Sequence, residues 1–192
     1  MTKKHFITYG TNKFDQSKYR LANQVKELNV FDVIKTYDDK SLTKDFREKH
    51  KKILKEERGG GYYIWKFDII NQELEKMDDG DYLVYLDAGC VINKEGLPRL
   101  HEYFDMLNKS DYGIMSFQMH HRECEWTCKQ VFDYLGASPK SDIGTSGQSL
   151  GGILVMQKKP HLLKVIGRIS KALDDDINLF TDYYKKETQH AG

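Results

Sequence analysis

The stretch from Asp81 to Asn93 constrains the fold more than any other part of the sequence. Residues 82–86 form an unbroken apolar and aromatic run, and the turn-forming residues 77–80 precede it. Such a run is typical of a strand that is buried on both faces, as in a parallel sheet covered by helices. The sequence therefore predicts an α/β fold of the Rossmann-like kind, with this strand in a mostly parallel central sheet flanked by helices.

A carboxylate and two small residues, Asp87, Ala88 and Gly89, follow this strand directly. In open α/β sheets, ligands bind beyond the carboxyl ends of the strands. We therefore expect Asp87 to project into a ligand crevice, where Ala88 and Gly89 let a bulky polar ligand approach the backbone. A carboxylate at this position suits Mg²⁺ or Mn²⁺ bound to phosphate oxygens. The alternative is an aspartate that only caps the turn after a core strand.

Length and composition exclude several classes of protein. A chain of 192 residues suits one domain, and 30 Lys+Arg against 29 Asp+Glu argue against a general nucleic-acid-binding surface. The only local basic bias, at residues 44–58, fits a solvated amphipathic helix. No apolar stretch is long enough to span a bilayer, and the first residues lack an apolar signal core. The odd number of cysteines, three, forms no disulfide framework, so we expect a cytoplasmic protein in a reducing compartment.

The order of the predicted elements fits a doubly wound fold. A β-rich run at residues 5–9, a helical pattern at residues 17–28 and a second strand pattern at residues 30–37 open the chain. Further strands are expected at residues 112–117 and 150–156, and further helices at residues 41–57, 64–77, 95–108, 126–135, 162–173 and 174–186.

The ends of the first two strands carry candidate nucleotide-binding residues. The base or ribose of a nucleotide commonly lies at the tip of a first strand, so Thr8, Tyr9 and Gly10 are candidates. Asp38, at the tip of the second strand, is placed to accept a hydrogen bond from a uracil N–H. Turns use the same residue types, so turn formation is the alternative at each position.

Three consecutive glycines, Gly59–Gly61, precede the helix expected at residues 64–77. Glycine loses more conformational entropy on folding than any other residue, so this run predicts that the segment requires glycine for a specific reason. A glycine loop can wrap around an anion, with backbone N–H groups and the helix start supplying positive potential. Arg58 and Lys66 flank the loop and complete a possible diphosphate clamp. The alternative is a flexible linker before a buried aromatic helix. The loop is neither a Walker loop nor a dinucleotide fingerprint.

Two motifs separated by a helix resemble nucleotide-sugar glycosyltransferases of the GT-A fold. They are Gly-Tyr-Tyr-Ile-Trp-Lys at residues 61–66 and Leu-Val-Tyr-Leu-Asp-Ala-Gly at residues 83–89. They are most similar to a group found in capsular-polysaccharide clusters and large DNA viruses, including a domain that glycosylates a viral capsid protein. The resemblance implies one GT-A domain over residues 1–192, trimmed at its C-terminus. Its activity would be transfer of a hexose or deoxyhexose from a UDP-sugar to a glycan hydroxyl. The first motif adds Gly61, Tyr62, Trp65 and Lys66 to the expected nucleotide-binding residues.

The resemblance also raises the question of a metal. In the GT-A fold a strand ends in Asp-x-Asp, which holds the cation that bridges the UDP phosphates. The matching triplet here begins at Asp87 and ends at Gly89, so the second carboxylate is missing. Mn²⁺ or Mg²⁺ would then depend on Asp87, the phosphates, water and a ligand from elsewhere. A literal Asp-x-Asp at residues 79–81 precedes the strand, at the wrong end of the sheet, and indicates a turn. The family's C-terminal His-Asp-Gln element has at most one counterpart, His190.

Residues expected to contact the sugar or the acceptor lie further along the chain. Ser116 is at the tip of a strand, and the resemblance continues at His121 and Trp126, whose indole offers an apolar face for a sugar ring. The competing interpretation of this region is a zinc site, although paired finger spacing is absent. Its ligands would be His120, His121, Cys124 and Cys128.

A second polar segment matches the family at residues 146–148 and at the glycine pair 151–152. The resemblance implies that Gly147 and Gln148 face the sugar. We expect Gln148 to form a hydrogen bond with it, which makes Gln148 a catalytic candidate beside Asp87. No catalytic base can be named, because Asp142, Glu123 and Glu125 are all carboxylates in plausible loops.

Two other functions stay open on the sequence. One is a UDP-sugar- or glycan-binding module whose metal site has decayed, as Gly89 suggests. The other is a sugar-nucleotide nucleotidyltransferase, although residues 10–13 are a poor version of the loop that such an enzyme needs after its first strand. Oligomeric state and the sugar that is transferred are not encoded in these motifs.

Overall fold

The computed structural model describes residues 2–186, so His190 lies outside the described residues. These residues form two compact units, one of residues 2–115 and 152–167 and one of residues 116–151 and 168–186. The single domain over residues 1–192 stays a prediction. Across residues 2–186, the helices are all too short or too polar to cross a membrane.

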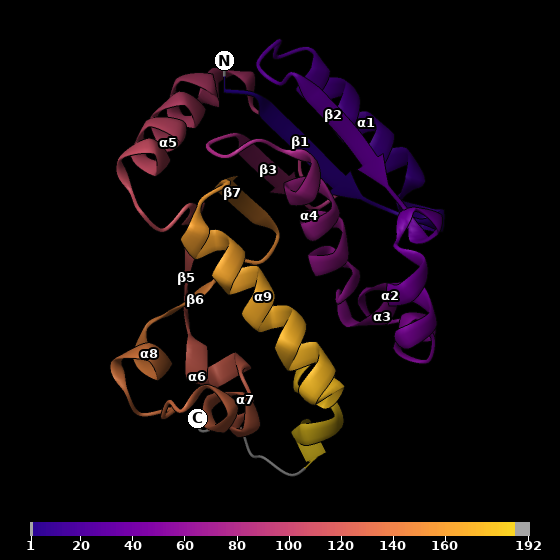
Figure 1. Cartoon of the computed structure of the whole chain (residues 1–192), viewed down its shortest axis with the longest axis vertical. Helices are drawn as coiled ribbons and strands as arrows, with labels where there is room; N and C mark the ends of the chain where they lie inside the picture. Colours follow the sequence, from indigo (N-terminus) through magenta and orange to yellow (C-terminus); the bar gives the residue numbers. More distant parts are fainter. Residues whose placement is uncertain (1, 187–192) are drawn as a thin grey trace. The chain divides into compact units, whose positions relative to one another are not determined.

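A five-stranded sheet forms the centre of the first unit (Figure 1). Its strand order is β2-β1-β3-β7-β4, and β1 pairs in parallel with both β2 and β3, whereas β7 is antiparallel to β3 and β4. The predicted mostly parallel α/β sheet is therefore confirmed. The strands are β1 (Lys4–Tyr9), β2 (Val33–Tyr37), β3 (Tyr82–Leu86), β4 (Ile114–Met115) and β7 (Ile153–Gln157).

The central strand β3 is buried on both faces, as its unbroken apolar run predicted. Leu83 and Tyr85 point to one face and join a core cluster with Ile69 of helix α4 (Trp65–Lys76). Tyr82 points to the other face, where its ring lies 4.7 Å from that of Phe104. Burying each large side chain contributes roughly 1.5–3 kcal/mol, so the apolar run fixes both the position and the orientation of β3.

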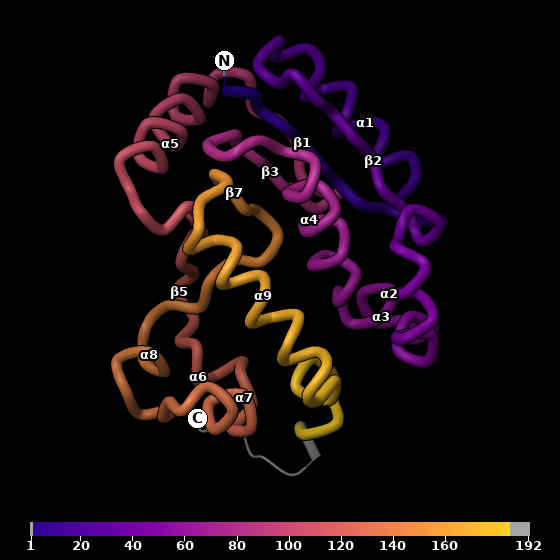
Figure 2. Tube along the Cα trace, in the orientation of Figure 1, coloured from indigo at the N-terminus to yellow at the C-terminus, as the bar shows by residue number. Residues whose placement is uncertain are grey.

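Helices cover both faces of this sheet. Helix α4 and the first part of α9 (Pro160–Asp175) contribute to the core cluster that contains Leu83 and Tyr85. Helices α1 (Asp15–Lys26) and α5 (Leu97–Lys109) pack on the opposite face, with Phe104 of α5 against Tyr82. Figure 2 traces how the chain passes between strand and helix to build these layers.

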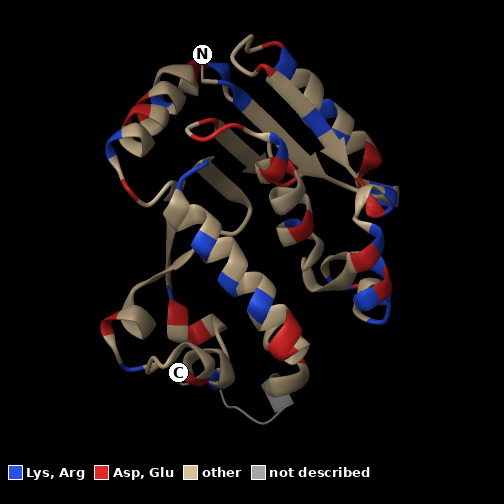
Figure 3. Cartoon of the chain, in the orientation of Figure 1, with Lys and Arg blue, Asp and Glu red and all other residues tan. Residues whose placement is uncertain are grey.

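The charged segment after β2 is not the single helix that was predicted for residues 41–57. It contains a 3₁₀ helix at Asp39–Ser41, α2 at Lys44–Lys49 and a second 3₁₀ helix at Ile53–Lys55. Helix α2 ends at His50, which is buried with its ring 4.5 Å from that of Phe46. Phe46 and Leu54 then pack on the core cluster, and this packing overrides the helical pattern. Basic and acidic residues stay mixed along the segment (Figure 3).

The second unit contains a two-stranded antiparallel ladder, β5 (Gln118–Arg122) with β6 (Gly147–Ser149). Of the helix predicted at residues 126–135, residues 129–135 are helical, whereas Trp126 ends an earlier helix, because Thr127 and Cys128 have extended backbones. The polar loop at residues 138–149 holds a short helix as well as β6, and the last predicted helix is replaced by two 3₁₀ helices after α9. These elements are α6 (Glu123–Trp126), α7 (Lys129–Leu135), α8 (Asp142–Thr145), Ile177–Phe180 and Tyr183–Lys186.

Candidate active site

The strand order reverses next to β1, because β2 and β3 lie on its two sides. Since these three strands are parallel, the residues that follow β1 and β3 leave the sheet at the same edge. They include Gly10 after β1 and Asp87 after β3. Ligands of open α/β sheets bind at such a reversal, outside the carboxyl ends of the strands. This edge of the first unit is therefore the candidate site.

Asp87 lies at this edge with a half-exposed carboxylate. Its backbone N–H donates to the Gly152 carbonyl at 2.9 Å, and 44% of its side chain is exposed. The Tyr85 hydroxyl donates to Oδ1, and Lys66 Nζ lies 3.3 Å from the same oxygen. One carboxylate oxygen is thus held by the protein, while much of the side chain faces solvent.

Gly152 lets the Asp87 carboxylate lie against the start of β7. A Cβ atom at position 152 would come within 2.8 Å of Asp87 Oδ2, closer than real Cβ contacts come. Any side chain there would displace the carboxylate or the strand. The close approach that this glycine allows is therefore to Asp87.

Lys66 carries a nearly buried ammonium beside this carboxylate. Its side chain is 10% exposed, and the rings of Tyr85, Tyr63 and Trp65 lie 4.7, 5.8 and 5.9 Å from Nζ. Burial lowers the pKa of the Lys66 ammonium, and the attraction of Asp87 opposes that shift only in part. The ring faces and the carboxylate together compensate a charge that would otherwise be costly to bury.

The glycine run forms one turn of left-handed helix before α4. Gly59, Gly60, Gly61, Tyr62 and Tyr63 all have positive φ, at 58°, 58°, 97°, 54° and 63°. The N–H of Tyr62 donates to the Arg58 carbonyl at 2.7 Å, and that of Tyr63 donates to the Gly59 carbonyl at 3.4 Å. This conformation costs an L-residue roughly 1–2 kcal/mol. The turn therefore requires the glycines and leaves two tyrosines strained.

The backbone N–H groups of this turn have partners inside the protein. Those of Gly60, Gly61 and Ile64 donate to the carbonyls of Glu57, Glu56 and Gly61. A Cβ atom on Gly61 would also come within 2.8 Å of Leu54 Cα. In this structure the run thus serves local hydrogen bonding and close packing. The predicted phosphate cradle stays a prediction that these N–H groups do not support.

Two predicted nucleotide-binding rings stack on each other. The centroids of Tyr9 and Trp65 are 3.7 Å apart with an angle of 15° between the planes, and both side chains are buried. Trp65 Nε1 also donates to the Gly59 carbonyl at 2.8 Å. Thr8 is fully buried, and its hydroxyl has no hydrogen-bond partner among residues 2–186. These side chains form the wall behind the site.

Gly10 and Arg58 both have contacts inside the protein. The Gly10 carbonyl accepts from Lys18 Nζ at 2.7 Å, and a Cβ atom at this glycine would be 3.0 Å from the Phe14 carbonyl oxygen. The Arg58 guanidinium lies 5.9 Å from the centroid of the Tyr62 ring.

Asp38 caps a turn, which was the alternative given for it. Its Oδ1 accepts from the Ser41 N–H at 2.9 Å and from the Ser41 hydroxyl at 2.7 Å. The hydrogen bond from the Ser41 side chain holds the pKa of Asp38 below its ordinary value. The uracil contact stays a prediction, and it would have to use the other carboxylate oxygen.

Arg20 is a residue of the site that sequence reasoning missed. It lies within α1, and its Nη2 donates to the carbonyls of Ala88 at 3.2 Å and Cys90 at 2.9 Å. Arg20 therefore tethers the turn that follows Asp87. Within residues 2–186, that turn keeps Ala88 buried and Gly89 exposed with open space around it, while the approach of a ligand to these residues stays a prediction. A basic residue in the middle of a polar helix is normally solvated, so no sequence signal marks Arg20.

Among the described residues, those around Asp87 supply one carboxylate and one ammonium, which is a poor fit for a divalent cation. Among residues 2–186, no three or more His, Cys, Asp or Glu side chains group so as to hold a metal ion, and this also removes the zinc interpretation. The Lys66 ammonium instead lies 3.3 Å from Asp87 Oδ1. Like charges 4 Å apart repel by roughly 4 kcal/mol per unit charge at an effective dielectric constant of about 20, and a divalent ion doubles this.

The predicted sugar-binding residues lie in the second unit. The rings of His121 and Trp126 are 5.3 Å apart in an edge-on arrangement, and Trp126 is 57% exposed. A Cβ atom on Gly147 would come within 2.6 Å of the Met119 carbonyl oxygen, so the glycine allows β6 to lie close to β5. Gln148 is a residue of β6. The Ser116 hydroxyl donates to the Ser149 hydroxyl at 3.2 Å.

The carboxylates considered as catalytic bases in this unit have local partners. Arg122 donates to Glu125 through its N–H at 3.0 Å and through Nε at 2.9 Å, and the Thr127 hydroxyl donates to Glu123. These bonds hold the first turn of α6. They give neither carboxylate a distinctive catalytic environment.

The first unit thus has the architecture of a ligand-binding open α/β sheet. No protein-family profile matches the sequence, and no curated protein matches it. Solved structures that are similar to it include two glycosyltransferases. One is a glycosyltransferase involved in the glycosylation of the major capsid of PBCV-1, with a TM-score of 0.53 and 14% identity over 97% of this chain and 73% of that chain. The other is mouse xyloside xylosyltransferase 1 in its apo form, with a TM-score of 0.48 and 14% identity over 96% of this chain and 82% of that chain.

The first of these similarities confirms at the level of the fold the resemblance that the two motifs predicted. At 14% identity it concerns the arrangement of strands and helices, and not the residues of the site.

Proposed function

We propose that this chain is a glycosyltransferase that moves a hexose or deoxyhexose from a UDP-sugar to a hydroxyl group of a glycan. The observation that carries this proposal is the half-exposed Asp87 carboxylate at the end of the central strand, beside the point where the strand order reverses. The shared fold with a solved glycosyltransferase supports it. By analogy with the capsid glycosylation named for that protein, we place the acceptor among viral or cell-surface glycans.

The chemistry divides between leaving-group stabilisation and sugar orientation. Charge grows on the diphosphate as the glycosidic bond breaks, so nearby cationic groups are the main electrostatic requirement. Lys66 and Arg58 flank the turn before α4 and are the residues proposed for this task. Trp126 and Gln148 are proposed to contact the sugar or the acceptor. The divalent cation of the family resemblance is left out, because the described residues around Asp87 fit it poorly.

A binding module without turnover is the second candidate function. The specific observation that favours it is Gly89, which stands where the family has a second carboxylate. Such a module would bind UDP or a UDP-sugar and release no sugar.

Titration calorimetry with UDP, followed by a screen of UDP-sugars for donor hydrolysis and transfer, tests these functions. A glycosyltransferase binds UDP and releases sugar from at least one donor. A binding module binds UDP and leaves every donor intact. A nucleotidyltransferase would instead release pyrophosphate from UTP and a sugar phosphate. A chain that binds neither UDP nor any UDP-sugar would contradict the proposal.

A further inference from the structure

Lys66 places its ammonium beside the carboxylate to which the family resemblance assigns a divalent cation. Its Nζ lies 3.3 Å from Asp87 Oδ1, and 10% of its side chain is exposed. The Tyr85 ring lies 4.7 Å from Nζ, and the hydroxyl of the same tyrosine donates to Asp87. The ammonium and the carboxylate are therefore held by shared neighbours.

The strained turn before α4 fixes the backbone that carries Lys66. The N–H of Lys66 donates to the carbonyl of Tyr63, the last of the five consecutive residues with positive φ, at 3.0 Å. The adjacent Trp65 is anchored twice, by stacking on Tyr9 and by its hydrogen bond to the Gly59 carbonyl. Backbone strain of this kind persists where the surrounding structure over-determines it, as at ligand sites. Here the strained turn presents Lys66 to Asp87.

The charges of the site match an ammonium better than a divalent ion. A pair of carboxylates is balanced by a divalent cation, whereas Asp87 is a single carboxylate because Gly89 occupies the other position. One ammonium balances one carboxylate. A lysine ammonium also has three N–H donors, so it can bind a carboxylate and a phosphate oxygen at the same time. Lysine is a common phosphate ligand, acting as a compact point charge.

We propose that Lys66 takes the place of the divalent metal ion at this site, with its ammonium bridging Asp87 and the diphosphate of the bound nucleotide. The chain then binds a nucleoside diphosphate without a metal. The identity of the ligand rests on the proposed function, whereas the anion-binding role of Lys66 rests on its contacts.

Calorimetric titration of the full chain with UDP, in EDTA and again in Mn²⁺, tests this role. We expect the two affinities to agree within about threefold. Lys66→Met should weaken UDP binding in EDTA by about 10- to 100-fold, as expected for loss of a hydrogen bond to a charged group. The same variant should leave the affinity for uridine, which has no phosphate, unchanged. Lys66→Arg keeps the charge and should retain most of the UDP affinity.

Lys94→Met is the matched control, because Lys94 is an exposed lysine whose partner is Glu27. It should bind UDP like the wild type. UDP binding that requires Mn²⁺, or that Lys66→Met leaves unchanged in EDTA, would overturn the role of Lys66. If Lys66→Met does not fold, Lys66→Gln takes its place, and UDP affinity in EDTA equal to that of the wild type would overturn the role of Lys66.

The failure of this inference and that of the proposed function can be told apart. Sugar transfer that occurs only with Mn²⁺ would keep the glycosyltransferase and overturn the role of Lys66. Inorganic pyrophosphate supplies the other test, since it binds without a base or sugar. Lys66-dependent pyrophosphate binding in EDTA, with no transfer from any donor, would keep the role of Lys66 and remove the glycosyltransferase. No binding of UDP or pyrophosphate in EDTA would overturn the role of Lys66.

Discussion

At each of two edges of the central sheet in the first unit, a charged side chain of α4 pairs with a residue within or next to a strand. At the edge where β1 and β3 begin, Glu73 of α4 meets His5 of β1. At the edge where these strands end, Lys66 of α4 meets Asp87 after β3. Glu73 is fully buried, whereas 44% of the Asp87 side chain is exposed.

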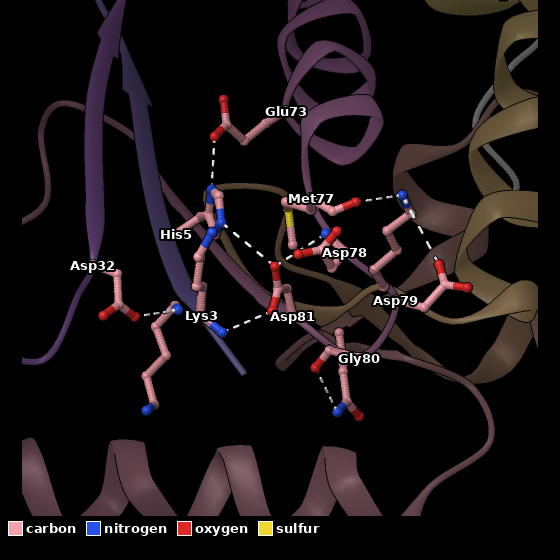
Figure 4. Close-up of polar contacts among 12 residues, drawn as sticks. Lys3, His5, Asp32, Glu73, Met77, Asp78, Asp79, Gly80 and Asp81 are labelled. Carbon is pink, nitrogen blue, oxygen red and sulfur yellow. Dashed lines mark hydrogen bonds and ion pairs between the residues drawn. The ribbon is translucent and has the colours of Figure 1, made fainter. Parts of the chain in front are cut away.

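The network around Glu73 gives both oxygens of that carboxylate partners within the protein, from His5 near the start of β1 to Tyr37 at the end of β2. Glu73 binds His5 Nδ1 at 2.8 Å, Lys35 Nζ at 2.8 and 2.9 Å, and the Tyr37 hydroxyl at 2.8 Å. Figure 4 shows His5 between Glu73 and Asp81, the second carboxylate of the literal Asp-x-Asp. Asp81 accepts from the backbone N–H groups of Lys3 at 2.7 Å and Asp78 at 3.1 Å, which confirms that residues 79–81 form a turn.

The difference separates a stabilising network from a candidate site. A buried carboxylate whose oxygens are both bound has nothing left for a ligand, and removing it leaves several groups unpaired. A half-exposed carboxylate beside strained backbone has capacity for a ligand and contributes less to folding. Changes at the first edge should therefore lower stability, and changes at the second should lower activity.

Glu73→Ala should have the largest effect. It leaves His5, Lys35 and Tyr37 without their common acceptor, and we expect the free energy of unfolding to fall by about 3–5 kcal/mol. Urea denaturation measures this loss, and activity per folded molecule should stay unchanged. Glu75→Ala, at an exposed position of the same helix, is the control and should change stability by less than about 0.5 kcal/mol. A loss of specific activity in folded Glu73→Ala would erase the contrast between the two edges.

Asp87→Asn should lower sugar transfer by about 100-fold, because the amide keeps the shape of the side chain and loses its charge. Steady-state kinetics with the best UDP-sugar donor measures the effect. The control is Asp79→Asn, since Asp79 belongs to the literal Asp-x-Asp at the opposite edge and its side chain is 92% exposed. Equal activity of Asp87→Asn and Asp79→Asn would show that the site lies elsewhere.

The fold was predictable where one residue pattern decides the structure. The run at residues 82–86 predicts β3 because burial on both faces leaves no polar position in the strand. The ladder of β5 and β6 was missed because its exposed polar residues lack the alternation of a half-buried strand. The break at His50 was missed because it depends on packing against residues distant in sequence, which no local pattern encodes.

Gly152→Ala should lower activity by about 10-fold, through displacement of the Asp87 carboxylate that the new methyl group would meet at 2.8 Å. Kinetic measurements should show the loss, while the melting temperature should change little because Asp87 is half exposed. Gly96→Ala is the matched control, since a Cβ atom there meets nothing within 4 Å. Full activity in Gly152→Ala would mean that the position of Asp87 does not matter for transfer.

Gly60→Ala isolates the strain of the left-handed turn. A Cβ atom at this position contacts only Trp65 Nε1, at 3.8 Å, so the positive φ is the main cause of any effect. We expect a loss of about 1 kcal/mol in the free energy of unfolding, measured by chemical denaturation. Gly89→Ala, in open space without a positive φ, should cost nothing measurable. Equal stability of the two variants would argue against the left-handed turn.

The candidate site was predictable in its residue types and not in its contacts. A carboxylate after a buried strand and a lysine after a glycine run both pointed to this edge. The sequence did not predict that Lys66 and Asp87 pair directly. The position of Lys66 depends on the left-handed turn before it, which has five consecutive positive φ angles. Tyr85 looked like a plain core residue, since nothing in a strand sequence shows that its hydroxyl meets a carboxylate two residues later.

The smallest effect should appear in the acid dependence of stability. Burial alone would raise the pKa of Glu73, but hydrogen bonds from Lys35, His5 and Tyr37 outweigh it and hold the pKa below the ordinary value of 4.5. A carboxylate whose pKa is lower in the folded than in the unfolded state contributes its full stabilisation when the pH is above its unfolded-state pKa. This contribution is lost as the pH falls through the folded-state pKa. The stability advantage of the wild type over Glu73→Gln should therefore be constant above about pH 5.5 and shrink below pH 4.5. Urea denaturation at a series of pH values measures the difference, with Glu75→Gln as the exposed control. An advantage that stays constant down to about pH 3 would mean that the buried network does not depend on the charge of Glu73.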